Sequence, residues 1–297
     1  MKHDKKERTS MMVQKIKIMK IIPFIAIMIL CFGTITGCMN VHVVKDTSRI
    51  IIAGSTSIQP YAELLEEAFT EKAANGLSAK MEIDIQGGGS SAGVTAAETG
   101  TADIGMSSRE LKDAEKEQLP YVIEIAKDGL AIIVHPSNPI ANLTLEQIRK
   151  IYTQEIKNWN ELGGKNAKIH IIAREDGSGT RSAFEELVMG KDYAIHPRAI
   201  VQNSNGAVRL LVSDDPNAIG FISLGLVEAH EEQKEVKALK LDGIEATSDN
   251  VKNGIYKLTR PFLFVSKNEP EGLAKDFIDF IFSPQGRELL AKEGLIV

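Results

Sequence analysis

Cysteine occurs only twice in this sequence, at Cys31 and Cys38. From residue 39 onward the chain has no thiol, which excludes a disulfide framework, a cysteine zinc site and a thiol redox pair there. Aromatic residues are also few, at 5% with a single tryptophan, and no basic stripe with interleaved aromatics is present to bind nucleic acid. A fold built from residues 39–297 must therefore be stabilised by packing.

The sequence also has no internal repeat at a fixed period of roughly 20 to 50 residues, which excludes solenoid and propeller architectures. Its 24 glycines follow no collagen-like period. The content of 43% hydrophobic and 25% charged residues is typical of a globular protein, and 297 residues suggest about two domains.

The net charge of −5 conceals an uneven distribution. Residues 1–37 carry seven Lys or Arg against two acidic residues, so residues 38–297 carry 28 basic against 38 acidic residues, a net charge of −10. A body this acidic repels nucleic acid and anionic lipid, and we expect no nucleic-acid partner. Any anion that the protein binds must be held by a local site.

The beginning of the chain has the pattern of an export signal. A basic region ends at Lys20, an uncharged stretch follows over residues 21–32, and small residues follow at 34–37. This order predicts a signal peptide over residues 1–37. A retained transmembrane anchor is the alternative, because residues 21–39 form 19 positions without charge.

The sequence Ile35-Thr36-Gly37-Cys38 resembles a bacterial lipobox, in which cleavage before the cysteine leaves that residue to carry lipid. The resemblance implies a diacylglycerol on Cys38, followed by a tether over residues 38–47. Two acyl chains hold a protein on a membrane where one chain dissociates. The expected location is the extracytoplasmic face of the cell membrane.

From residue 49 onward, short β-branched segments alternate with helical patterns, which predicts an α/β architecture with parallel-rich sheets and helices on both faces. The expected strands cover residues 49–53, 80–86, 102–106, 121–126, 130–135, 168–173, 199–202, 218–222 and 261–265. The expected helices cover residues 61–72, 92–99, 144–152, 180–189 and 272–282, with a capping box at Thr144 and Gln147.

Ligands of such folds lie at the carboxyl ends of the strands. Four of the expected strand ends lead into turns that combine hydroxyl groups with glycine or with residues that cap helices, at residues 54–57, 87–93, 107–109 and 174–181. Exposed amides at a helix start and Ser or Thr hydroxyls donate to anions without adding net charge. A single turn of this kind serves plain helix capping, whereas four that converge would bind an anion.

Other readings of the same turns are less complete. Residues 89–93 match the G-x-S-x-G nucleophile elbow, which makes a serine hydrolase with Ser91 as nucleophile an alternative. The downstream histidines that it needs, His196 and His230, lie in polar or charged segments.

The spacing Gly87-x-Gly89-x-x-Ala92 is only a weak signal of a dinucleotide-binding motif. The six histidines have no partner at metal-ligand spacing, so we predict no metal and no cofactor.

Taken in order with the lipobox, the four turns resemble those of the phosphate-binding lipoproteins of ABC-type phosphate importers, over about residues 49–297. The resemblance implies a type II periplasmic-binding-protein fold with two lobes joined by a two-strand hinge, the strands crossing near residues 128–134 and 259–265. The first lobe would comprise residues 48–129 and 260–297, and the second lobe residues 130–259.

The resemblance also implies the phosphate-binding residues. The first lobe would supply Thr56, Ser57, Ser90, Ser91, Ser108 and Arg109, and the second lobe Arg174, Asp176, Ser178, Gly179 and Thr180. In some members an Asp that accepts phosphate's proton stands at the position of Ser108. A carboxylate there admits protonated phosphate and repels sulfate, so the serine removes one means of discrimination.

The implied function is to bind inorganic phosphate outside the cell and to deliver it to the membrane subunits of an ABC permease, as a monomer and without catalytic turnover. A binding protein for another tetrahedral oxyanion, such as sulfate or molybdate, is the alternative with the same fold. A serine hydrolase that uses Ser91 is the alternative of another class.

Overall fold

The computed structural model describes residues 49–74 and 81–297. The expected signal peptide, Cys38 and the tether over residues 38–47 lie outside the described residues. In the described ranges, no helix is both long and apolar enough to cross a membrane.

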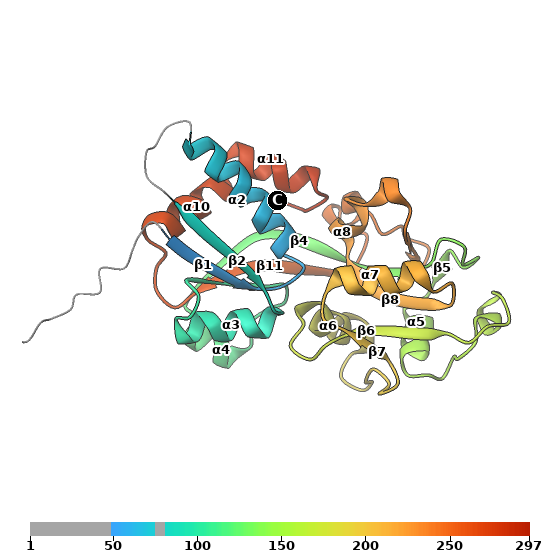
Figure 1. Ribbon diagram of the computed structural model, residues 1–297. Helices are drawn as coiled ribbons and strands as arrows, with labels where there is room; N and C mark the ends of the chain where they lie inside the picture. Colours follow the sequence, from blue (N-terminus) through green and yellow to red (C-terminus); the bar gives the residue numbers. More distant parts are fainter. Residues whose placement is uncertain (1–48, 75–80) are drawn as a thin grey trace, which may run out of the picture. The chain divides into compact units, whose positions relative to one another are not determined.

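Parallel strands begin the main sheet (Figure 1). The strand β1 (Arg49–Gly54) pairs in parallel with β2 (Glu82–Gly87) on one side and with β3 (Ile104–Ser107) on the other. Alternate residues of β1, Ile50 and Ile52, are buried, as expected for a strand with one face on a core. All three strands therefore end at the same edge of the sheet.

Two long strands connect this part of the sheet to the rest. The strand β11 (Thr259–Ser266) is antiparallel to β3 and to β4 (Tyr121–Val134). Over its last five residues, β4 leaves β11 and pairs with β8 (Ala218–Ser223) instead. Figure 1 shows β4 and β11 running between the two groups of strands.

The second group has the order β4-β8-β6-β7, with β6 (His170–Arg174) parallel to β8 and to β7 (Ile200–Gln202). A short strand, β9 (Lys237–Ala238), also pairs with β4. The strands β5 (Asn142–Leu143) and β10 (Lys240–Leu241) form a separate two-stranded sheet.

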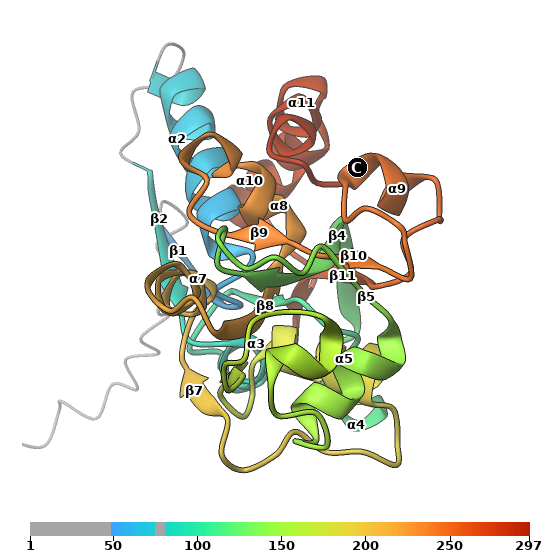
Figure 2. The same ribbon diagram turned by 90° about the vertical axis from the view of Figure 1, so that its right-hand side faces the viewer.

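Helices cover both faces of the first group of strands (Figures 1 and 2). On one face lie α2 (Gln59–Ala74), α10 (Gly272–Phe282) and α11 (Pro284–Lys292), and on the other lie α3 (Ser90–Thr99) and α4 (Asp113–Gln118). The remaining helices are α5 (Leu145–Tyr152), α6 (Gly179–Phe184), the π-helix η2 (Glu185–Met189), α7 (Asn205–Asp214), α8 (Leu224–Glu228), α9 (Ser248–Lys252) and the 3₁₀ helices η1 (Trp159–Leu162) and η3 (Glu231–Gln233).

Two large clusters of buried side chains fill the interior. The first core takes its buried members from residues 50–126 and 262–295, and the second core from residues 130–258. Each core is apolar, and aromatic pairs such as Phe184 and Phe221, with ring centroids 4.0 Å apart, pack within it. Packing of this kind takes the place of the absent disulfides.

The predicted α/β alternation is confirmed, and so is the capping box of α5, where the Thr144 hydroxyl accepts from the amide of Gln147 at 3.1 Å. The prediction of separate strands at 121–126 and 130–135 is wrong. The polar residues between them pair with β11 and keep the strand continuous. The predicted helix at 180–189 changes from α to π geometry at Glu185.

Candidate functional site

The turn after β1 and the turn after β3 meet at their hydroxyl groups. Ser55 donates from its Oγ to the Oγ of Ser108 at 2.9 Å, and the Oγ atoms of Ser90 and Ser108 lie 3.3 Å apart. The backbone N–H of Ser108 donates to the Oγ of Ser90 at 3.0 Å. All three serines are buried, because β1, β3 and the start of α3 pack side by side.

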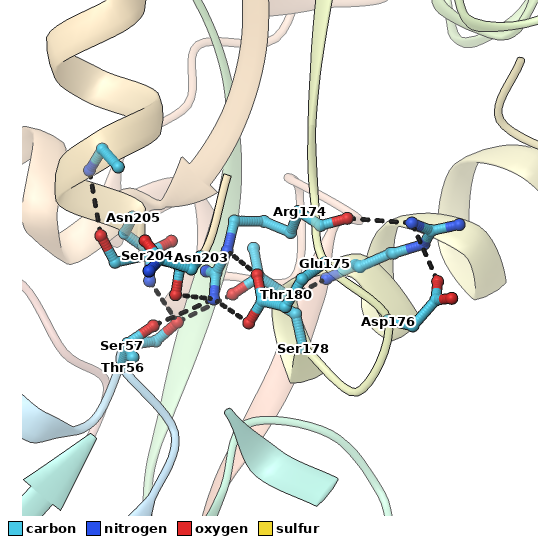
Figure 3. Close-up of polar contacts among 12 residues, drawn as sticks. Thr56, Ser57, Arg174, Glu175, Asp176, Ser178, Thr180, Asn203, Ser204 and Asn205 are labelled. Atoms are coloured by element: carbon cyan, nitrogen blue, oxygen red, sulfur yellow. Dashed lines mark hydrogen bonds and ion pairs between the residues drawn. The ribbon is translucent and has the colours of Figure 1, made fainter. Parts of the chain in front are cut away.

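The first turn also contacts the turn after β6, which belongs to the second core. The Oγ of Ser57 lies 2.8 Å from the Oγ1 of Thr180, and the Nδ2 of Asn205 donates to the same Ser57 oxygen at 2.8 Å. Figure 3 shows these contacts, in which residues more than one hundred positions apart come together. Hydroxyl groups from segments that pack on different cores thus form one buried hydroxyl cluster, made of Ser55, Ser57, Ser90, Ser108 and Thr180.

Arg174 ends β6 with its side chain in this cluster (Figure 3). Its Nη2 donates to the Oγ1 of Thr56 at 3.1 Å, and its Nε and Nη2 donate to the carboxylate of Glu175 at 2.8 and 2.9 Å. The side chain is 1% exposed, and its Nη1 has no hydrogen-bond partner among the described residues. A buried N–H without a partner costs free energy unless a ligand accepts from it.

A second guanidinium lies behind the hydroxyl groups. Arg260 of β11 forms a fully buried ion pair with Asp128 of β4, with Nη2 and Oδ2 2.8 Å apart. It also donates to the Oγ1 of Thr180 at 2.8 Å and to the Oγ of Ser57 at 3.1 Å. The pair therefore connects the two long strands to hydroxyl groups of both cores.

Burial acts strongly on the pair of Asp128 and Arg260. It raises the pKa of the Asp128 carboxyl and lowers the pKa of the Arg260 guanidinium, and the attraction between the two groups opposes both shifts. The positive charge of Arg174 lowers the pKa of Arg260 further. Two guanidinium groups thus lie close enough to influence each other, which favours a negative charge between them.

Gly179 lets the start of α6 approach the hydroxyls of Ser90 and Ser108 closely. A Cβ at this position would lie 2.2 Å from the Oγ of Ser90 and 2.5 Å from the Oγ of Ser108. Gly179 is the first residue of α6, and the preceding Ser178 caps that helix by accepting from the amide of Arg181 at 3.2 Å. Only a residue without a side chain fits between the hydroxyl groups and the start of α6.

Some of the predicted site residues lie elsewhere. The Asp176 side chain is 93% exposed and pairs with Arg181. Arg109 is buried, but its guanidinium forms two hydrogen bonds of 2.8 Å with the carboxylate of Glu115. Ser91 contacts Arg109 at 3.3 Å and uses its backbone N–H to donate to Gly177 O. The structure therefore brings together Thr56, Ser57, Ser90, Ser108, Arg174, Gly179 and Thr180, and leaves Asp176 and Arg109 outside the hydroxyl cluster.

Arg260, Asp128 and Asn205 are not among the site residues predicted from the sequence. A signal for two of them was present, because Asp128 and Arg260 interrupt apolar strands and the two residues stand opposite each other in the β4–β11 pairing. A charged residue in a buried strand requires a partner of opposite charge. Asn205 offered no comparable signal, since its role depends on where α7 begins.

The cluster has the chemistry of an anion site. It contains hydroxyl and guanidinium donors, and the carboxylates nearest to them, Asp128 and Glu175, are each paired with an arginine. In the described ranges, no group of three or more His, Cys, Asp and Glu side chains could hold a metal ion. Guanidinium donors bind tetrahedral oxyanions through two oxygens at once, and hydroxyl donors add directional contacts.

Comparison with known proteins adds independent evidence. Residues 43–285 match the family model of the PBP superfamily domain. Two phosphate-binding proteins PstS are 31% identical to this chain: that of Bacillus subtilis over 80% of this chain and 77% of its own length, and that of Borreliella burgdorferi over 92% and 97%. A substrate-binding protein from Clostridium perfringens, solved with bound phosphate, is 45% identical, with a TM-score of 0.77 over 84% of this chain and 98% of that one.

Proposed function

The chain belongs to the PstS family of phosphate-binding proteins within the PBP superfamily, and we propose that its hydroxyl cluster binds inorganic phosphate for delivery to an ABC-type import permease. The fold is the type II periplasmic-binding-protein fold. Relatives that match this chain over most of its length are named for phosphate binding, and one was solved with phosphate bound.

One observation carries the proposal: buried hydroxyls from two separate cores lie in contact, and a buried arginine N–H of the same cluster has no hydrogen-bond partner among the described residues. Ser57 and Thr180 meet across the two cores, and the Nη1 of Arg174 is buried without an acceptor. An oxyanion between these groups would accept from donors on both sides. A buried guanidinium N–H without an acceptor costs free energy, and a bound oxyanion would supply that acceptor.

The magnitudes agree with a transport receptor. Micromolar affinity corresponds to about −8 kcal/mol, and each hydrogen bond to a charged group contributes roughly 1.5 to 3 kcal/mol. Several such bonds from Thr56, Ser90, Thr180 and Arg174 exceed this requirement. The cost of removing phosphate from water cancels most of the gross gain.

We propose that the two cores are the centres of two lobes, residues 48–129 with 260–297 and residues 130–259, and that β4 and β11 form the hinge between them. Since the donors come from both lobes, the ion stabilises the closed arrangement in proportion to its greater affinity for that arrangement. The closed form would then dock on the membrane subunits of the permease as a monomer.

The proposed location follows from the beginning of the sequence. Residues 1–37 would be removed as a signal peptide, and Cys38 would carry the diacylglycerol that anchors the protein to the extracytoplasmic face of the cell membrane. Residues 38–47 would then form the tether. The matched relatives are phosphate-binding proteins PstS and an ABC transporter substrate-binding protein, which supports an extracytoplasmic role.

We propose a binding protein without catalytic turnover. The candidate nucleophile Ser91 receives a hydrogen bond from Arg109, whereas each described histidine bonds to a group elsewhere in the fold, for example His170 to Asp215 at 2.6 Å. A serine hydrolase needs a base in contact with its nucleophile. Incubation with an acyl ester and with a serine-directed phosphonate tests this point, and turnover or labelling at Ser91 would contradict it.

Calorimetry on the mature, phosphate-stripped protein tests the proposed function. We expect titration with inorganic phosphate to give saturable binding at one site, and titration with sulfate and molybdate to give weaker binding. Tighter binding of sulfate or molybdate would assign the site to another tetrahedral oxyanion. Absence of heat with all three anions would refute the proposal.

A further inference from the structure

The hydrogen bonds around Ser57 fix the direction in which its hydroxyl donates. A hydroxyl oxygen accepts at most two hydrogen bonds and donates one. The Oγ of Ser57 accepts from the Nη2 of Arg260 at 3.1 Å and from the Nδ2 of Asn205 at 2.8 Å. The orientation of the Asn205 amide is set by its other end, which accepts from the backbone N–H of Ser223. Both lone pairs of Ser57 are therefore occupied, so Ser57 can only act as the donor in any further contact of its hydroxyl.

The same count applies to Thr180. Because Ser57 can only donate, Thr180 is the acceptor in the 2.8 Å contact between the two hydroxyls. Its Oγ1 also accepts from the Nη1 of Arg260 at 2.8 Å. Both of its lone pairs are occupied too, and its own hydrogen meets no further acceptor among the described residues. Thr180 thus presents a free donor at the junction of the two cores.

Arg260 has no N–H left for a ligand. A guanidinium carries five N–H groups, and those of Arg260 form five hydrogen bonds, to Asp128 twice and to Ser57, Thr180 and Ser108 once each. Arg174 differs, because its Nη1 has no hydrogen-bond partner in the part of the chain that the structure describes. The two arginines therefore have separate tasks, and only Arg174 has an N–H available for a bound ion.

We infer that Arg260 is a positioning residue, which occupies one lone pair of Ser57 and one of Thr180, so that Ser57 donates to Thr180 and the Thr180 hydroxyl is fixed as a donor to an oxyanion. The inference rests on the proposed function. Asp128 holds the guanidinium in place, and its other oxygen accepts from Ser223 of the second core. The anion oxygen that faces Thr180 must then act as the acceptor.

A double-mutant cycle on phosphate affinity tests this role. Thr180→Val removes the oriented hydroxyl and keeps the shape of the side chain. We expect it to lower the affinity of the wild-type protein about tenfold, the value of one charge-assisted hydrogen bond. In a background of Arg260→Met with Asp128→Leu, which replaces the buried ion pair by apolar side chains, we expect a decrease of less than about twofold.

Thr56→Val is the matched control, because the Thr56 hydroxyl accepts from Arg174 and makes no contact with Arg260. It should lower the affinity by the same factor in both backgrounds, and Thr180→Ser should retain wild-type affinity. Arg260→Lys provides a second background if the double replacement fails to fold, since an ammonium group has three N–H donors and cannot keep all five hydrogen bonds of the guanidinium. Equal effects of Thr180→Val in the two backgrounds would overturn the inference. Absence of phosphate binding by the wild type would instead refute the proposed function itself.

Discussion

Arg174 is the residue on which the proposed binding energy depends most. It is buried at the end of β6, its carboxylate partner Glu175 fixes two of its nitrogens, and its Nη1 remains available. Thr56 lies on the same guanidinium but offers only one hydroxyl. The two N–H groups of Nη1 can both donate to one ion, whereas a hydroxyl donates only once.

We therefore expect Arg174→Ala to lower phosphate affinity by at least about tenfold, and by more than Thr56→Ala does. Calorimetry on both variants measures the difference, with thermal unfolding as the control for correct folding. Arg174→Lys keeps the charge but loses the planar guanidinium, and its phosphate affinity should lie between those of Arg174→Ala and Thr56→Ala. Wild-type affinity in Arg174→Ala would show that this arginine has no contact with the ion.

Gly179 gives a second prediction at the scale of single residues. Gly179→Ala would place a methyl group against the hydroxyls of Ser90 and Ser108, so we expect phosphate affinity to fall at least about tenfold. Gly206→Ala in α7 is the matched control, because a Cβ there would meet its nearest neighbour, the Oγ of Ser204, at 4.0 Å. Unchanged affinity in Gly179→Ala would mean that the start of α6 does not lie against Ser90 and Ser108 in the phosphate-bound protein.

The predictability of the site from sequence differs from residue to residue. Thr56, Ser57, Ser90 and Thr180 lie in strand-to-helix turns or at the helix starts that follow them, so the rule that ligands lie at strand ends was sufficient to identify them. Arg260 and Asn205 escape this rule, because one lies within a strand and the other begins a helix. Their roles depend on contacts between segments far apart in the chain, which local patterns do not encode.

Among the elements, α4 explains why Arg109 is not in the hydroxyl cluster. The sequence analysis did not predict this helix, whose six residues carry no apolar pattern. Its Glu115 accepts two hydrogen bonds from Arg109 and one from the amide of Lys112. Arg109 thus anchors α4, and the motif that contains it could not reveal this partner.

The ion pair of Glu115 and Arg109 gives a prediction of pH dependence. The hydrogen bonds from Arg109 lower the pKa of Glu115, although burial opposes the shift. Because the folded pKa lies below the unfolded value of about 4.3, the pair stabilises the protein above that pH and loses its effect as the pH falls through the folded pKa. Glu115→Gln should lower the free energy of unfolding by about 2 kcal/mol at pH 7, and much less near pH 3.

Urea unfolding of the wild type and of Glu115→Gln at both pH values measures this difference. Glu288→Gln is the control, since Glu288 pairs with Lys292 on the surface of α11 and should contribute little at either pH. A Glu115→Gln effect that is equally large at both pH values would contradict the assigned ion pair.

The strand β4 shows the limit of sequence patterns at this scale. Polar residues between two apolar segments predicted a break, and the structure instead has one strand that pairs with β11 over its first part and with β8 over its second. The buried pairing of Asp128 with Arg260 satisfies the charges that produced the apparent break. The predicted hinge positions at 128–134 and 259–265 include this exchange of partners.

At the scale of the whole molecule, the proposed lipid anchor rests on the sequence alone. Cys38→Ser should abolish lipid attachment, because the hydroxyl cannot form the thioether. We expect wild-type protein expressed in a bacterium to enter the detergent phase on phase separation, and the variant to stay in the aqueous phase or to retain its uncleaved signal. Equal partitioning of cleaved wild type and variant would contradict a lipid on Cys38.

The central claim is that hydroxyls and a guanidinium from both cores surround one tetrahedral oxyanion. Arsenate has the same shape and charge as phosphate, and its arsenic atom can be located by anomalous diffraction. The most direct test is a crystal structure of the phosphate-stripped protein with arsenate. We expect a single arsenic peak with oxygens in hydrogen-bonding distance of Arg174 Nη1 and Thr180 Oγ1. A peak elsewhere, or none at saturating arsenate, would refute binding at this cluster.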